Sequence, residues 1–189
     1  MQKTLKIVVL ISVSLFLCSL IGAASAANVY NITDNSYSKY FNTTGHINNT
    51  NVQAGDTLDL SGTIKNKDMY IDRSLNITSS KKTAQILNGT INILSGGSGT
   101  NVTNLKIKNS NTNGIGIFLY KTENNTIKGN QIHCNGPDGF GIALTDSNHN
   151  KILDNIVITT QYLTSNNQNR THSTVVLGGS NNNTIESNT

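Results

Sequence analysis

The sequence predicts an all-β fold, a right-handed parallel β-helix in which one chain winds through coils of about 25 residues. Three observations predict it. Aliphatic residues recur every 25 positions, short alternating strand patterns follow the same period, and Asn or Gly clusters separate the strands. No helix-length apolar pattern occurs after residue 50, which disfavours a repeat of alternating strands and helices.

The 25-residue period appears in several independent columns of aliphatic residues. They are Ile77, Val102, Ile127 and Ile152, then Ile107, Ile132 and Val157, and the pairs Ile117 with Ile142 and Leu119 with Leu144. Stacking the coils would place each column inside the solenoid. Asn130, Asn155 and Asn188 form a polar column, and Leu105 holds that position in the preceding coil. Stacked asparagines can exchange amide hydrogen bonds along the axis.

One step of the repeat is longer than the others. Ile142 to Val175 and Ile152 to Ile185 are both 33 positions apart, so eight extra residues lie between Ile158 and Val175. Because the register is kept on both sides, residues 159–174 are predicted to leave the stack as a polar loop.

Three segments are expected along the chain. Residues 1–26 have the pattern of a secretory signal peptide, with Lys3 and Lys6, a short apolar run from Ile7 to Ile21 and the small residues 24–26. Residues 27–50 do not fit the period and are predicted to cap the first coil. Residues 51–189 form the repeats. They stop soon after Ile185 has opened a new coil, so we expect a C-terminal truncation.

The composition fits a solvated, turn-rich exterior. Charged residues make up 13% of the chain, whereas it contains 30 Asn, 23 Thr and 18 Ser. Without the two lysines of the signal segment, 12 basic and 10 acidic residues leave a net charge of +2, and no basic stripe indicates nucleic-acid binding. Cys134 is the only cysteine outside the signal segment, so no intrachain disulfide is expected.

Several stretches resemble a known family. The run from Gly55 to Gly62, followed by 71–78, resembles the opening of adhesin-like proteins of methanogenic archaea, and 101–107 and 124–132 resemble their parallel β-helix repeats. The resemblance covers residues 28–189 and implies a cell-surface location. Similar repeats occur in pectate-lyase-like enzymes and in copper-loading accessory proteins of nitrous oxide reductase. The resemblance therefore indicates the fold more specifically than it indicates the function.

Two kinds of reactive site are weighed. A carbohydrate-active β-helix enzyme needs converging carboxylates, and Glu123 with Asp146 could lie near one edge on adjacent coils, with Asp138 and Asp154 as further candidates. Too few acidic residues cluster to predict a Ca²⁺ site. His133-Cys134 is the one soft-ligand pair, beside separate histidines at 46, 149 and 172, but metal sites usually recruit three or four ligands.

The preferred interpretation is therefore a secreted or cell-surface binding or structural protein with no catalytic residue, metal or cofactor. Its expected partners are glycans or surface proteins of other cells. Nucleic acid is not expected, and contact with a membrane is expected only through the signal segment or a missing C-terminal anchor. Candidate contacts are Phe118, Tyr120 and Phe140 and, in the predicted loop, Tyr162, Asn166, Asn167, Asn169 and Arg170.

Export would also permit N-glycosylation. Nine Asn-x-Ser/Thr sequons occur, at Asn31, Asn42, Asn48, Asn76, Asn88, Asn101, Asn124, Asn169 and Asn182.

Overall fold

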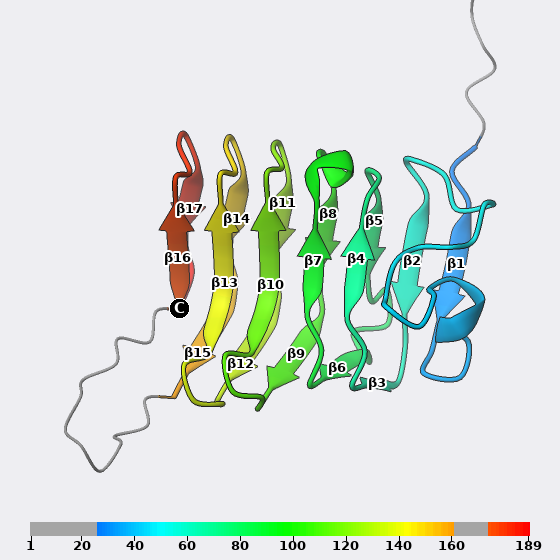
Figure 1. Ribbon diagram of the computed structural model, residues 1–189, viewed down its shortest axis with the longest axis horizontal. Coiled ribbons are helices and arrows are strands. Elements are labelled where there is room, and N and C mark those ends of the chain that lie inside the picture. The colour runs from blue at the N-terminus through cyan, green and yellow to red at the C-terminus, as the bar shows by residue number, and fades with distance from the viewer. Residues whose placement is uncertain (1–25, 161–173) are drawn as a thin grey trace, which may run out of the picture.

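The protein is a parallel β-solenoid, as the period of the sequence predicts. The computed structural model describes residues 26–160 and 174–189. Every strand pair in the three sheets is parallel, and each complete coil from β2 to β16 contributes one strand to each sheet, so the sheets run along the long axis of the molecule (Figure 1). The three sheets enclose one hydrophobic core.

Sheet 1 has seven strands, β1 (Val29–Ile32), β2 (Thr57–Leu60), β5 (Asn76–Thr78), β8 (Asn101–Thr103), β11 (Thr126–Lys128), β14 (Lys151–Leu153) and β17 (Thr184–Glu186). Sheet 2 has five, β4 (Met69–Ile71), β7 (Ile91–Ile93), β10 (Ile115–Tyr120), β13 (Phe140–Thr145) and β16 (Val175–Gly178). Sheet 3 has five, β3 (Thr63–Lys65), β6 (Gln85–Leu87), β9 (Lys106–Asn109), β12 (Gln131–Cys134) and β15 (Ile156–Thr159).

The aliphatic columns predicted from the sequence stack as expected. Ile127 pairs with Val102 on one side and with Ile152 on the other, and Ile132 pairs with Ile107 and Val157. The side chains of these columns are almost wholly buried in the core. Since successive side chains of a strand point to opposite faces, the residues between them point to solvent.

The 33-residue step also keeps its register. Ile142 pairs with Val175 and Ile152 with Ile185. The chain after the long connection therefore adds β16 to sheet 2 and β17 to sheet 1 in the predicted register. Most of that connection, residues 161–173, lies outside the described residues.

The early coils are shorter than the repeat predicts. Leu58 pairs with Ile77, 19 positions later, and Ile64 pairs with Ile86, 22 positions later. One coil is longer, since Ile91 pairs with Ile117, 26 positions later. The extra residue lies at the corner that holds the 3₁₀ turn η2 (Ser95–Gly97), because nine positions separate Ile93 from Val102 whereas eight separate Leu119 from Ile127.

The N-terminal segment contributes both a strand and a covering loop. β1 is the edge strand of sheet 1, and the 3₁₀ turn η1 (Tyr37–Lys39) follows it. Tyr37 and Phe41 are buried and stacked, with ring centroids 4.6 Å apart, and the Tyr37 hydroxyl donates to the backbone oxygen of Asp68 in the first coil. These loops lie at the β1 end of the stack (Figure 1). In the described ranges, no helix has the length and apolar character needed to cross a membrane.

Two asparagine ladders line the corners at the two ends of β11, β14 and β17 in sheet 1. In the predicted ladder, Asn130 Nδ2 donates to Asn155 Oδ1 (3.0 Å), and Asn155 Nδ2 donates to Asn188 Oδ1 (2.9 Å). Leu105 begins the column, and its backbone N–H donates to Asn130 Oδ1. A second ladder that we did not predict runs through Asn125, Asn150 and Asn183, with Thr100 in the preceding coil.

Candidate functional site

The outer face of sheet 3 carries two columns of side chains that the alternation of the strands points to solvent. Gln85, Lys106, Gln131 and Ile156 form one column by register, and Leu87, Lys108, His133 and Ile158 form the other. Neighbouring coils are about 4.8 Å apart, and residues two apart on one strand are about 6.6 Å apart. The face is therefore a regular grid whose geometry the backbone fixes.

The grid is hollowed into a shallow groove of about 330 Å³. Two lysines, one histidine and two glutamines supply its polar lining, and the described part of the groove contains no acidic residue. Ile156 and Ile158, 45% and 49% exposed, form an apolar end on β15, the edge strand of the sheet. We call this site the sheet 3 groove.

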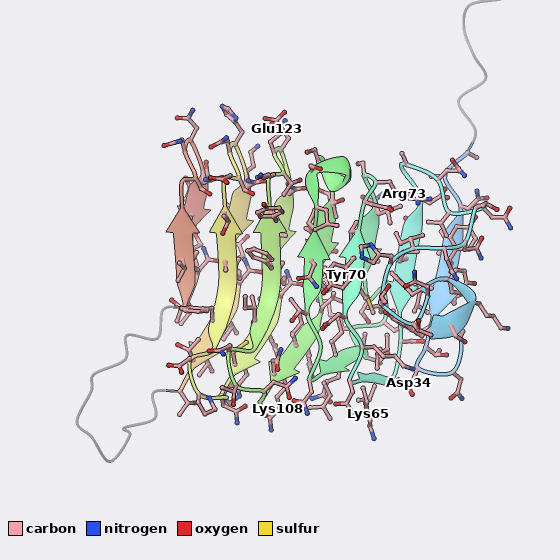
Figure 2. All side chains as sticks on the ribbon, viewed as in Figure 1. Asp34, Lys65, Tyr70, Arg73, Lys108 and Glu123 are labelled. Carbon is pink, nitrogen blue, oxygen red and sulfur yellow. The ribbon has the colours of Figure 1, made fainter. Side chains whose placement is uncertain are left out.

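Lysines in and near the groove form one positive surface. Lys106 and Gln131 also line a second hollow of about 120 Å³, to which Lys82 contributes from the loop after β5. Lys65 and Lys108 project from the same edge of the molecule, away from the core (Figure 2). At the β1 end of this edge, Lys67 is paired with Asp34 at 3.0 Å. Donation of the Lys65 backbone N–H, together with that ion pair, lowers the pKa of the Asp34 carboxyl.

The polar side chains of this groove contrast with two paired cations elsewhere on the surface. Arg73 is paired with Asp72 and Lys128 with Asp154. By contrast, within the described ranges no side-chain hydrogen bond or ion pair is made by Lys106, Lys108, Gln85, Gln131 or His133. Ligand groups can therefore bind them without breaking an existing contact.

Sheet 1 shows the opposite arrangement at β5 and β8. The outward polar side chains of these two strands pair with one another along the axis. Asn101 Nδ2 donates to Asn76 Oδ1 (2.9 Å), and Thr103 Oγ1 donates to Thr78 Oγ1 (3.0 Å). These groups stabilise the stack and offer less hydrogen-bonding capacity to a ligand.

The acidic residues weighed as catalytic candidates lie at different corners. Glu123 and Asp146 line one polar hollow of about 320 Å³ between sheets 2 and 1, together with Lys121. Their proximity follows from the pairing of Glu123 with Asn148, two residues after Asp146. A side-chain hydrogen bond with Tyr120 and the nearby Asp146 raise the pKa of Lys121.

The other two acidic candidates lie elsewhere. Asp154 is ion-paired with Lys128 at 3.4 Å, at the corner between sheets 1 and 3, and Asp138 lies in the turn between β12 and β13. Glu123 and Lys108 project from opposite edges of the molecule (Figure 2). The carboxylate corner and the sheet 3 groove are therefore separate sites.

His133 and Cys134 point to opposite sides of β12 and do not converge. His133 lines the groove, whereas Cys134 is 1% exposed within the core. Burial raises the pKa of the Cys134 thiol to about 12, so the thiol is protonated at neutral pH and is a poor nucleophile. In the described residues, no three or more His, Cys, Asp or Glu side chains gather to hold a metal ion.

Aromatic candidate contacts lie on the outer face of sheet 2. Phe118 and Tyr120 are stacked at 6.0 Å between ring centroids, and Lys121 Nζ lies 5.1 Å from the Tyr120 ring. Tyr70 stands on the same face (Figure 2) and is covered by His46 at 4.6 Å. Much of this aromatic surface is therefore occupied by its own neighbours.

The predicted loop contacts Tyr162, Asn166, Asn167, Asn169 and Arg170 lie outside the described residues, and their role in binding stays a prediction. Asn169 is also the one sequon there.

The other eight sequons divide into two groups. Asn31, Asn42, Asn48, Asn124 and Asn182 are exposed. The half-buried asparagines make hydrogen bonds that a glycan would disturb, since Asn76 Nδ2 donates to Gly55 O, Asn101 Nδ2 donates to Asn76 Oδ1, and Asn88 Oδ1 accepts from Ser110 N.

The sheet 3 groove was missed in the sequence, although its signal is present. Lys106-x-Lys108 and Gln131-x-His133 are 25 positions apart and flank Ile107 and Ile132, which the period had already aligned. The outward residues on either side of an aligned core residue must themselves be aligned.

Comparison of the chain with protein-family models, curated proteins and solved structures found no match.

Proposed function

We propose that this protein is a secreted or cell-surface binding scaffold, adhesin-like and non-catalytic, that recognises glycans or proteins of other cells. One contrast carries the proposal. On sheet 1, Asn76 pairs with Asn101 and Thr78 with Thr103, whereas the cations and amides of the sheet 3 groove have no partner in the described ranges. A rigid solenoid that holds unpaired polar groups at fixed spacings is suited to binding a repetitive surface.

Two features of the sequence support the surface location. The signal-like segment at residues 1–26 favours export, and the repeats at 101–107 and 124–132 resemble those of adhesin-like proteins of methanogenic archaea. The high content of Asn, Thr and Ser keeps the exterior solvated with few charges. These features concern location and leave the ligand to be found by experiment.

Binding and catalysis can be tested together. The purified chain is incubated with a panel of soluble polysaccharides and whole cell walls, while retention of the protein and release of new chain ends are both measured. We expect retention without cleavage. Reproducible cleavage that is lost on Glu123→Gln or Asp146→Asn would contradict the proposal.

The alternative function is a carbohydrate-active β-helix enzyme, and one observation favours it. Glu123 and Asp146 line the same hollow as Lys121, so two carboxylates and a cation share one corner. Hydrolysis of a glycosidic bond needs a carboxylic acid beside a carboxylate. Titration of the two carboxyls by NMR distinguishes the enzyme from the binding scaffold. Acid catalysis requires one of the two carboxyls to have a raised pKa, whereas a binding scaffold does not require it.

A further inference from the structure

The sheet 3 groove has the charge of an anion-binding surface. Lys106 and Lys108 are exposed on one strand, and His133 follows Lys108 on the next coil. No acidic side chain lines the groove within the described residues, and neither lysine makes an ion pair there. An anionic ligand would therefore meet uncompensated positive charge in a shallow hollow.

Amide side chains flank one of the two lysines along the axis. Gln85 and Gln131 are the neighbours of Lys106 in the preceding and following coils. A glutamine amide both donates and accepts, so it can pair with sugar hydroxyls as well as with carboxylates. The column thus alternates an amide, a cation and an amide.

The axial spacing indicates how a ligand would lie. The three members of the column are about 4.8 Å apart, since each belongs to a successive coil. This step is close to the advance per ring of an extended 1,4-linked polysaccharide. A polymer lying along the solenoid axis would therefore meet one rung per sugar. The exposed Ile156 and Ile158 would face the C–H surfaces of its rings at the β15 end.

Resting on the proposed binding function, we propose that the sheet 3 groove binds an acidic polysaccharide, one carboxylate of which pairs with Lys106 and Lys108 on β9 and whose hydroxyls pair with Gln85 and Gln131 on the neighbouring coils. The same groove is poorly suited to nucleic acid, because no Phe, Tyr or Trp lines it in the described residues and unpaired bases bind by stacking on such large aromatic side chains. A membrane surface is also disfavoured, because in the described ranges just two exposed isoleucines, Ile156 and Ile158, lie beside the lysines.

The test uses the full chain and soluble polymers as probes. Binding of alginate, a carboxylated 1,4-linked polymer, is compared with binding of neutral hydroxyethyl cellulose. We expect the Lys106→Ala/Lys108→Ala variant to bind alginate about tenfold more weakly than the parent chain, since two exposed charge contacts are lost. The matched control is Lys39→Ala/Lys151→Ala, which removes the same charge at exposed positions outside the groove and should change the affinity less than about twofold.

Two further readouts separate the parts of the proposal. Added salt should weaken alginate binding by the parent chain more than by the groove variant. Salt screens the charges of Lys106 and Lys108, which the variant lacks. Gln131→Ala should weaken binding at unchanged net charge. Equal thermal unfolding midpoints of parent and variants would show that these exposed substitutions leave the fold intact.

The outcomes distinguish this inference from the function on which it rests. If the chain binds alginate but the groove and control variants weaken equally, the groove assignment is overturned and the binding scaffold stands. If duplex DNA or phosphatidylserine vesicles bind more tightly than alginate, the ligand class is overturned. If no polysaccharide, cell wall or protein surface retains the chain, the proposed function itself fails.

Discussion

Single buried asparagines fasten each coil to the next at the corners of the solenoid. Asn155 is 1% exposed, yet all its polar groups are paired. Its Nδ2 donates to Ile127 O and to Asn188 Oδ1, both at 2.9 Å, and its Oδ1 accepts from the backbone N–H and Nδ2 of Asn130 at 3.0 Å. Low local polarity strengthens such bonds and makes an unpaired partner costly.

Replacing Asn155 by alanine should therefore be strongly destabilising. The change leaves the N–H of Asn130 buried without a partner, which costs about 1–3 kcal/mol, and it also removes the hydrogen bonds of Asn155 with Ile127 O and Asn130 Nδ2. We expect the free energy of unfolding to fall by at least about 2 kcal/mol, measured by denaturant titration. Asn188→Ala is the control, because Asn188 stands at the less buried end of the same ladder. Similar losses in both variants would contradict the role assigned to burial.

Prediction from the sequence succeeded at these positions for a physical reason. A buried amide is tolerated only where it is paired, so an asparagine column at the coil period indicates a ladder. The column of Asn125, Asn150 and Asn183 follows the same spacings and could have been predicted by that argument. The outward residues of sheet 3 were harder to predict as a site, because packing does not restrict the residue type at solvent-facing positions.

At the scale of the strand, two glycines permit sheet 2 to approach sheet 3. In β13, a Cβ added to Gly141 would lie 2.1 Å from Val157 Cγ1 and 2.6 Å from the backbone oxygen of Thr174. In β10, one added to Gly116 would lie 2.5 Å from Ile132 Cγ2. Each of these strands therefore has a glycine at its second position, beside the core residues of sheet 3.

Gly141→Ala should destabilise the protein, since the added methyl group must displace a core side chain and a backbone oxygen. Overpacking of this kind costs about 1–3 kcal/mol. Gly178→Ala in β16 is the matched control, because its Cβ would meet no atom closer than 3.8 Å. We expect thermal unfolding to shift downward for Gly141→Ala and little for Gly178→Ala. A shift of equal size in the two variants would refute the packing argument.

Elements were predictable where the period is strict and less so where corners differ. From Ile77 onward along sheet 1, identical spacing and alternation gave the strands and their inward residues. Before Ile77 the coils are shorter, and later in the chain η2 adds a residue at one corner. A fixed period therefore cannot locate the strands of these coils. Turn length is set by local backbone geometry, and the chain can vary it without changing the stacked core.

At the scale of the whole molecule, stability is expected to be nearly a sum of coils and of the contacts between neighbours. The long connection between β15 and β16 leaves the register of both flanking coils intact. Its length should therefore matter little to the fold. The cost of closing a flexible loop rises by only about 0.6 kcal/mol for each doubling of its length.

Deleting eight residues, 164–171, restores the 25-residue step and should leave the solenoid folded. We expect the thermal unfolding midpoint to stay within about 4 °C of the parent, since about 1 kcal/mol shifts a protein of this size by 2–4 °C. The control deletes 123–130, also eight residues, and removes β11 with the ladder residues Asn125 and Asn130. That chain should lose cooperative unfolding, followed by circular dichroism. If the loop deletion were as damaging as the control, the coils would not be independent of the connection, and stacking alone would not explain the fold.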